Sequence, residues 1–186
     1  MARAPKNGRP AAAGTLTLTL LRHAKASRDE PESGDIGRAL TGRGRRNADA
    51  VGQWMASAKH LPELVLCSTA TRTRETLELV LPHLATAKPK VSYADRLYLA
   101  GPLTLLKTLH ESPKRTHHLM LIGHNPGLHA LALDLVADGP QDRIAALGRK
   151  LPTSGLVAIS FPLANWTDVV AGSGTLVAFN APSDGE

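Results

Sequence analysis

The order of hydrophobic and polar positions divides the chain into short apolar runs that alternate with longer amphipathic segments. The first run alternates Thr and Leu from Thr15 to Leu20, and this period of two predicts a strand with one apolar face. Further aliphatic runs have the length and composition of strands. Including the first, strands are expected at residues 15–21, 63–68, 90–93, 117–122, 155–161 and 175–180. The pattern thus predicts a sheet of about six strands.

Segments with a helical period separate the first four strands, and helices are expected at residues 41–59, 69–84 and 102–110. Thr41 is the expected N-cap of the first, and Pro102 opens the third. The buried stripe of the second is expected to comprise Thr73, Leu77, Val80, Leu81 and Leu84. A further helix is expected after the strand at 117–122, with Asn125 as its N-cap and Pro126 in its first turn.

This alternation of strand and helix predicts an α/β fold, a three-layer α/β/α sandwich whose central sheet is mostly parallel. The segment between the last two strands, residues 162–174, has no room for a crossover helix. The last two strands are therefore expected to form an antiparallel edge of the sheet.

Composition narrows the class of protein. A chain of 186 residues with 42% hydrophobic content predicts one domain over residues 15–182, preceded by a basic, Pro- and Gly-bearing tail over residues 1–14 that is expected to be disordered. No apolar run approaches the roughly 18 residues of a membrane helix, and the first residues lack the apolar centre of a signal peptide. Cys67 is the only cysteine, which excludes an intrachain disulfide. We expect a cytoplasmic protein without a membrane partner.

The net charge of +6 favours anionic partners in general. Aromatic residues make up only 3% of the chain, so the stacking surfaces on which single-stranded nucleic acids bind are scarce. The composition therefore favours a phosphorylated molecule over nucleic acid as the partner.

Unusual polar residues follow three of the expected strands. Arg22 and His23 stand where the first strand ends, Arg72 lies in the opening turn of the helix after the second, and His124 directly follows the fourth. Because the carboxyl ends of parallel strands share one edge of a sheet, these side chains are expected to meet. Arginine gives bidentate donors to phosphoryl oxygens, and neutral imidazole is a nucleophile near pH 7. The pattern predicts a site for a phosphoryl group.

Each of these residues also has a simpler interpretation. An Arg-His pair is by itself a polar loop, and Arg72 could instead pair with Glu75 on the helix surface. Lys25 is by default a solvated lysine. Adjacent strand residues point to opposite faces, so His117 and His118 cannot easily share a metal ion, and no metal site is expected.

Four segments resemble, in order, the motifs of the histidine phosphatase superfamily, whose fold is called phosphoglycerate mutase-like. LRHAKAS is similar to its Arg-His-Gly signature, with Ala24 in place of Gly, and LTGRGRRNA is similar to a Leu-Thr-x-x-Gly-x-x-Gln-Ala motif, with Asn47 in place of Gln. CSTATRTRET resembles the segment of the second arginine, and IGHNPGL that of the second histidine. Only one strand and one short helix separate Arg72 from His124, without the inserted cap of members that act on small metabolites. The chain therefore looks most like the small SixA-type branch, which is associated with protein phosphohistidine.

The resemblance implies a mechanism and its residues. His23 would attack phosphorus and become transiently phosphorylated, Arg22 and Arg72 would clamp the phosphoryl oxygens, and His124 would support the developing charge. Water would then release phosphate, with no metal and no organic cofactor. Substrate binding is assigned to the same two arginines and His124, together with Asn125 and Lys25. The resemblance thus implies a phosphatase whose substrate is a phosphorylated protein or a small phosphorylated molecule.

The acid of larger family members has only a tentative counterpart, Asp95, and an acid at a strand end more often binds loop N–H groups. A phosphohistidine substrate relaxes the need for an acid, because a protonated imidazole leaves phosphorus as a neutral molecule. The alternatives are a phosphomonoesterase for a small metabolite and a non-catalytic module that binds phosphoprotein. The polar segment at residues 27–39 is expected to be a mobile surface loop beside the pocket.

Overall fold

The structure, a computed structural model, describes residues 14–29 and 31–182. The predicted tail over residues 1–14 lies outside this range except for Gly14, and the domain boundaries stay a prediction. Within the described residues, no helix combines the length and the apolar character needed to cross a membrane.

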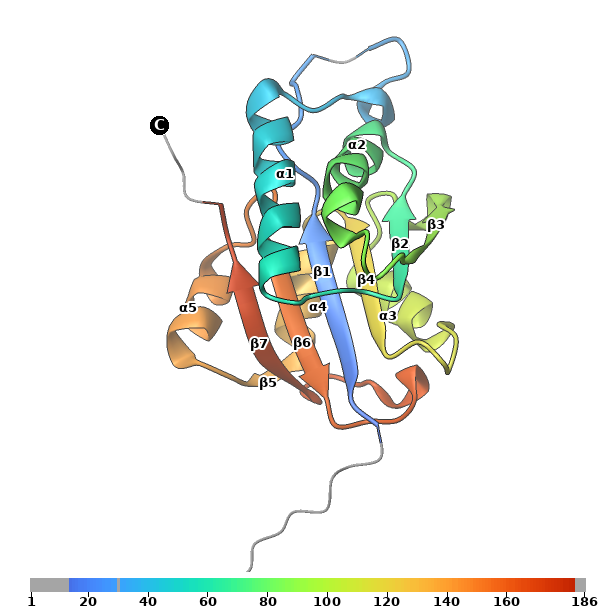
Figure 1. Cartoon of the computed structure of the whole chain (residues 1–186), viewed down its shortest axis with the longest axis vertical. Coiled ribbons are helices and arrows are strands. Elements are labelled where there is room, and N and C mark those ends of the chain that lie inside the picture. The colour runs from blue at the N-terminus through green and yellow to red at the C-terminus, as the bar shows by residue number, and fades with distance from the viewer. Residues whose placement is uncertain (1–13, 30, 183–186) are drawn as a thin grey trace, which may run out of the picture.

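One seven-stranded sheet organises the chain, in the order β3-β2-β4-β1-β6-β7-β5 (Figure 1). Six strands lie where the sequence predicts them, to within one residue at either end: β1 (Leu16–Arg22), β2 (Leu64–Ser68), β3 (Lys90–Ala94), β4 (His118–Gly123), β6 (Leu156–Phe161) and β7 (Gly174–Asn180). The seventh, β5 (Val136–Asp138), was not predicted. Its three residues are too few to show a period of two.

The sheet is mostly parallel. Strands β3, β2, β4 and β1 run in one direction, whereas β6 is antiparallel to both of its neighbours, β1 and β7. The predicted antiparallel pairing of the last two strands is therefore confirmed, and the short β5 adds to the outer side of β7 in parallel. All four parallel strands end at the same edge of the sheet, which fixes where the functional side chains lie.

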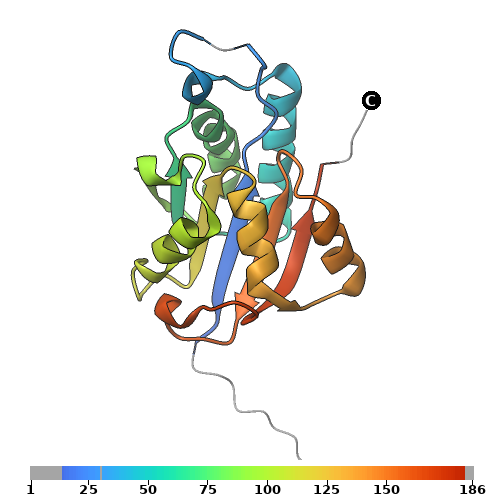
Figure 2. The ribbon, with the colours of Figure 1, turned by 180° about the vertical axis from the view of Figure 1, so that it is seen from behind.

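Helices cover both faces and give the predicted three layers. The helices α1 (Gly42–Ser57) and α2 (Thr71–Val80) lie on the face seen in Figure 1, and α3 (Pro102–His110), α4 (Gly127–Leu135) and α5 (Gln141–Arg149) lie on the face seen in Figure 2. The sequence pattern had not indicated α5. Short 3-10 turns, η1 (Asp35–Gly37), η2 (Leu81–Leu84), η3 (Asp95–Leu97) and η4 (Trp166–Asp168), complete the fold.

The structure confirms the expected start of the first helix and divides the second. The Thr41 hydroxyl accepts a hydrogen bond from the Gly44 amide at 3.0 Å, as expected of an N-cap. The second predicted helix is divided, because α2 ends at Val80 and tightens into η2. Leu84 is buried as expected, whereas Leu81 is only partly buried.

The alternation in β1 separates two apolar cores. Leu16, Leu18 and Leu20 are buried in the larger core beneath α3 and α4, and Leu21 points to the smaller one beneath α1 and α2. Burial of leucine contributes about 1.5 to 3 kcal/mol for each side chain. A strand held from both faces cannot slip in register without turning its leucines over, so its carboxyl end is rigidly placed.

Candidate active site

Side chains from three strand ends converge on one pocket of about 260 Å³. Arg22 is the last residue of β1 and His23 follows it, Arg72 is the second residue of α2, and His124 comes directly after β4. All four line the pocket, together with Lys25, Asn125, Ala26, Arg38, Leu99 and Thr153. The rings of His23 and His124 lie 5.2 Å apart between centroids.

Backbone hydrogen bonds hold the His23 segment between its neighbours. The His23 amide donates to the Gly123 carbonyl at 3.1 Å, and the His23 carbonyl accepts from the Ser154 amide at 3.1 Å. The Ala24 amide donates to the Thr76 hydroxyl at 3.0 Å. Ala24, the departure from the family's glycine, is fully buried in a small apolar cluster with Leu40 and Ala48. The extra methyl group therefore fits its surroundings.

The hydrogen bonds of His23 select one tautomer. Its Nδ1 lies 2.8 Å from the Ala24 carbonyl, which can only accept, so Nδ1 carries the proton and Nε2 keeps its lone pair. Burial lowers the pKa of His23 to about 4, and the nearby charges of Arg72 and Arg22 act in the same direction. His23 is therefore neutral at pH 7, with a free nitrogen for nucleophilic attack.

The second histidine is held in the opposite tautomer. Arg72 Nη2 lies 3.3 Å from His124 Nδ1, and because a guanidinium only donates, Nδ1 accepts. The proton then resides on Nε2, which donates to the Ser68 hydroxyl at 2.8 Å. Burial, followed by the charges of His23 and Arg72, lowers the pKa of His124 to about 3. The sequence analysis did not identify Ser68 as a partner of His124. Its position as a hydroxyl residue at the carboxyl end of β2 could have indicated this role.

Asp35, in the loop between β1 and α1, accepts hydrogen bonds from the Arg72 guanidinium. The Arg72 guanidinium donates to the Asp35 backbone carbonyl at 2.6 Å and to its carboxylate at 2.9 Å. Tyr98 donates to the same carboxylate oxygen at 2.6 Å, and Arg38 binds the other oxygen at 2.8 Å. The Tyr98 hydroxyl above all, with Arg72 and Arg38, holds the pKa of Asp35 well below its usual value. The predicted surface loop thus supplies an ionised group that the sequence did not single out.

Arg22 and Asn125 are both fixed by the Leu151 carbonyl, to which Arg22 Nη1 donates at 3.0 Å and Asn125 Nδ2 at 2.9 Å. Arg22 Nε is buried without a hydrogen-bond partner among the described residues. The expectation that Asn125 caps the following helix is wrong: α4 begins at Gly127, after Pro126, and no side chain caps it. Asn125 lines the pocket instead, and its Nδ2 is held by the Leu151 carbonyl.

The tentative acid lies elsewhere. Asp95 is exposed in η3 and does not line the pocket. Among the described residues, the lining contains neither Asp nor Glu. The site therefore offers the guanidinium groups of Arg22 and Arg72 and a neutral nucleophile, and the Asp35 carboxylate bound to Arg72 is held ionised.

The described residues offer neither a reactive thiol nor a cluster of metal ligands. Cys67 is fully buried in β2, and burial raises the pKa of its thiol to about 12. Within residues 14–29 and 31–182, no group of three or more His, Cys, Asp or Glu side chains is arranged to hold a metal ion.

The lowered pKa values give a prediction for titration of the free protein. We expect NMR signals of the His23 ring to titrate with a midpoint near pH 4 and those of His124 near pH 3, below the usual value of about 6.5. Inorganic phosphate bound at the pocket is expected to raise the pKa of His124, because a nearby negative charge favours the imidazolium. Midpoints of His23 and His124 near the usual value of about 6.5 would contradict the assignment.

The Asp35 contact gives a second prediction. Asp35→Asn removes a negative charge next to Arg72 while keeping an oxygen that accepts from Tyr98. We expect inorganic phosphate or vanadate to bind about three- to tenfold more tightly, the effect of roughly 1 kcal/mol of electrostatic competition at a partly exposed pair. Isothermal titration calorimetry measures this. Asp29→Asn, in the same loop and hydrogen-bonded to Ser27, is the matched control, and weaker binding by Asp35→Asn would contradict the competition.

Comparison with known proteins gives consistent matches. The model of the histidine phosphatase superfamily (branch 1) matches residues 18–97. The uncharacterized protein Rv1276c of Mycobacterium tuberculosis is 35% identical over 164 residues, 87% of this chain and 99% of that protein. The structure "Putative Phosphohistidine Phosphatase SixA" from Nakamurella multipartitia is 31% identical and superposes with a TM-score of 0.77, covering 92% of this chain and 99% of that one. Its counterpart from Agrobacterium tumefaciens is 29% identical, with a TM-score of 0.75 over 90% and 98% of the two chains.

Proposed function

Since the chain belongs to the histidine phosphatase superfamily and to its small SixA-type branch, we propose that it is a phosphatase that removes the phosphoryl group from phosphohistidine on a protein. In the first step, Nε2 of His23 forms a bond to phosphorus as the bond from phosphorus to the substrate imidazole breaks. The substrate imidazole leaves neutral, because its other nitrogen already carries a proton. In the second step, the oxygen of water forms a bond to phosphorus as the bond from phosphorus to His23 Nε2 breaks. Neutral His23 is regenerated, and phosphate leaves with both protons of the water.

The site supplies what phosphoryl transfer requires of a protein, which is positioning and charge stabilisation. Arg22 and Arg72 neutralise the phosphoryl oxygens, and Arg72 keeps further N–H groups beyond those given to Asp35. His124 lies between Arg72 and Ser68. Its Nδ1 accepts from the Arg72 guanidinium, so His124 supports the developing charge by holding Arg72 in place.

The observation that carries the substrate assignment is the composition of the pocket. No Asp or Glu lines it among the described residues, and the Asp35 carboxylate bound to Arg72 is held ionised by Tyr98, Arg72 and Arg38. An alkoxide leaving group would therefore depart without a carboxylic acid to protonate it, whereas the imidazole of phosphohistidine needs none. The short connection from Arg72 to His124, which holds η2, β3, η3 and α3, adds no covering domain. A phosphoryl group on a protein surface can therefore approach the pocket.

The experiment offers three substrates to the protein: a phosphohistidine protein, a phosphoserine peptide and p-nitrophenyl phosphate. We expect kcat/KM for phosphohistidine to exceed that for phosphoserine by about 100-fold or more, since general acid catalysis contributes factors of that size. A preference for phosphoserine would favour a phosphomonoesterase. Binding of the phosphohistidine protein without turnover would favour a binding module. The cytoplasmic location expected from the sequence stays a prediction.

A further inference from the structure

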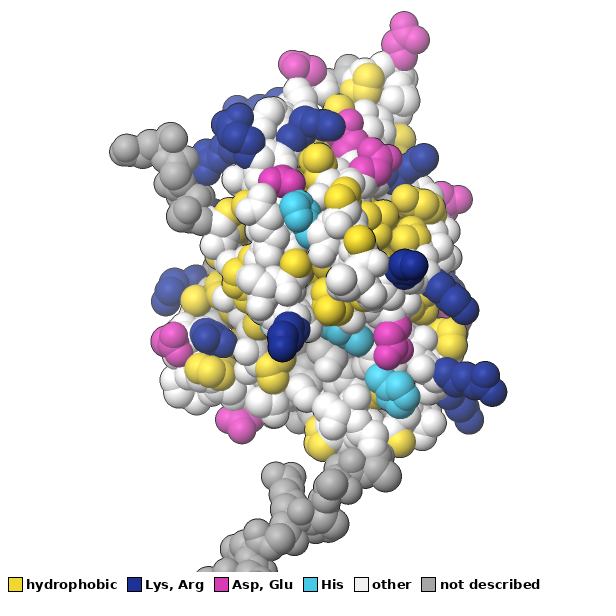
Figure 3. Space-filling view, viewed as in Figure 1, with side chains coloured by type: hydrophobic (Ala, Val, Ile, Leu, Met, Phe, Trp, Pro, Cys, Tyr) yellow, Lys and Arg dark blue, Asp and Glu magenta, His cyan; other side chains and the backbone are white. Residues whose placement is uncertain are grey.

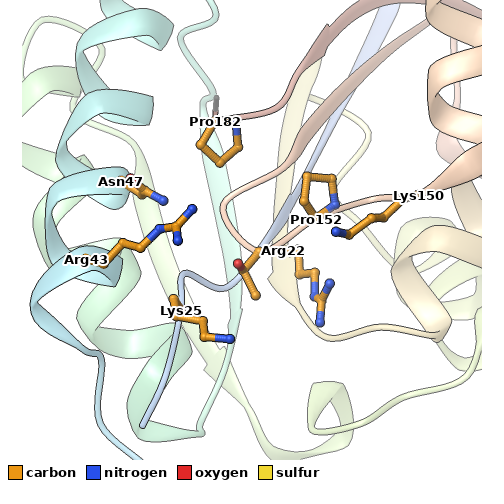
Figure 4. Close-up of a pocket in the computed structure, with 8 residues that line it drawn as sticks. Arg22, Lys25, Arg43, Asn47, Lys150, Pro152 and Pro182 are labelled. Carbon is orange, nitrogen blue, oxygen red and sulfur yellow. The ribbon is translucent and has the colours of Figure 1, made fainter. Parts of the chain in front are cut away.

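The phosphoryl pocket continues into a longer depression at the carboxyl edge of the sheet. A second pocket of about 280 Å³ shares Arg22, Lys25 and Thr153 with it. Figure 4 shows Arg43 and Asn47 from α1 facing Lys150 and Pro152 across this space. A third pocket of about 460 Å³ shares three residues with the second and adds Ala146, Arg149, Phe179 and Ala181. We call the second and third pockets together the basic groove.

The charge of the basic groove is of one sign. Among the described residues, its lining includes Arg43, Arg149 and Lys150 and no Asp or Glu. Within that part of the chain, the Lys150 ammonium makes no ion pair with a carboxylate. In Figure 3, Lys and Arg side chains gather over the upper end of α1. Clustered cations at a depression raise the local potential and favour an anionic ligand.

We propose that the basic groove binds an acidic segment of the substrate protein next to its phosphohistidine, an inference that rests on the proposed function. When the phosphoryl group of the substrate lies next to His23, the chain on one side of the substrate histidine would pass Lys25 and Arg43 and then reach Lys150. Aspartate and glutamate carboxylates are the complementary charges. Beyond Lys150, the partly buried Phe179 offers an apolar surface to a side chain further along.

The extent of the groove favours an extended chain over a small metabolite. An extended peptide advances about 3.3 Å per residue, so several residues are needed to run from the phosphoryl pocket through two further pockets. A small phosphate ester would fill the pocket of about 260 Å³ and leave the basic groove without a ligand. The groove thus adds selectivity that depends on sequence near the phosphohistidine.

The test uses two phosphohistidine peptides that differ only in flanking residues, Asp and Glu in one and Asn and Gln in the other. The wild-type protein is expected to show a kcat/KM about tenfold higher for the acidic peptide, decreasing with salt as exposed charges are screened. Lys150→Glu is expected to abolish or reverse this ratio. Lys114→Glu, with the same charge change on an exposed lysine before β4 at the opposite edge of the sheet, is expected to keep it. Circular dichroism of each variant checks the fold.

The outcomes separate this inference from the proposed function. Equal kcat/KM for the two peptides in the wild type would overturn the inference and leave the phosphatase proposal standing. Failure to hydrolyse either peptide would overturn both. A preference for the acidic peptide that persists in the double variant Lys150→Glu with Arg43→Glu would also contradict binding of the acidic segment in the basic groove. Discrimination that appears only after removal of residues 183–186, which include Asp184 and Glu186, would assign the groove to the chain's own acidic residues.

Discussion

His23→Ala is expected to lower kcat for phosphohistidine and for p-nitrophenyl phosphate by about 10⁴-fold or more, because losing a covalent nucleophile removes the reaction path itself. The structure gives the reason in atomic terms: Nδ1 is tied to the Ala24 carbonyl at 2.8 Å, so Nε2 is the only nitrogen of this ring with a lone pair. The pKa lowered to about 4 keeps that lone pair available throughout the neutral range. Steady-state and single-turnover rates measure the loss.

The control for this substitution is His117→Ala, which removes the same ring from an exposed position at the other end of β4. It should retain activity within a factor of about two, as surface substitutions generally do. Vanadate binding should persist in His23→Ala, because Arg22 and Arg72 remain. Activity in His23→Ala within tenfold of wild type would falsify the nucleophile assignment.

Arg72→Ala is expected to lower kcat/KM by about 10³-fold, the size of effect seen when one main donor to a transition-state oxyanion is lost. The substitution also removes one of the three partners of the Asp35 carboxylate and the donor to His124 Nδ1. The kcat/KM of Arg72→Lys should also be lower than that of the wild type, by about 100-fold. A single ammonium group cannot replace the planar guanidinium that contacts both Asp35 and His124. Competitive inhibition by vanadate should weaken in parallel.

Arg74→Ala provides the matched control from the same helix. Arg74 is exposed, and its guanidinium lies over the Tyr93 ring at 5.3 Å, away from the pocket. Its removal should change kcat/KM by less than about twofold. A kcat/KM of Arg72→Lys equal to that of the wild type would contradict the proposal that Arg72 binds the phosphoryl oxygens. A loss of kcat/KM in Arg74→Ala as large as that in Arg72→Ala would also contradict it.

The sequence locates the four central side chains because each follows a strand with a strong apolar signal. Leu16, Leu18 and Leu20 in β1 leave no second register, so Arg22 and His23 can only stand at its end. Parallel strands then bring Arg72 and His124 to the same edge. This part of the site depends on local pattern and one general rule of α/β sheets.

The order of the strands, which sequence does not give, accounts for Asp95. Its strand, β3, is separated from β1 by β2 and β4, and three strand spacings amount to roughly 14 Å. The chain returns toward the pocket only after η3, where Tyr98 comes within 5.4 Å of the His124 ring, measured between centroids. An acidic residue at a strand end suggested a catalytic acid, but β3 lies too far from β1 in the sheet for Asp95 to reach the pocket.

The remaining contacts arise between loops. Asp35 reaches Arg72 across 37 positions of sequence, and Asn125 finds the Leu151 carbonyl across 26. Neither pairing has a periodic signal, because loop residues follow tertiary contacts and not a repeating local pattern. The short β5 was missed because a three-residue strand lacks a measurable period.

The most direct test of the central claim is to find the phosphoryl group on the protein during turnover. Wild-type protein is mixed with a substrate carrying ³²P in its phosphoryl group, quenched in alkali, which preserves phosphorus–nitrogen bonds, and digested for mass spectrometry. The account predicts label on the peptide that contains His23, at Nε2, and none in His23→Ala. Label on a different residue, or full turnover with no labelled protein at any quench time, would contradict it.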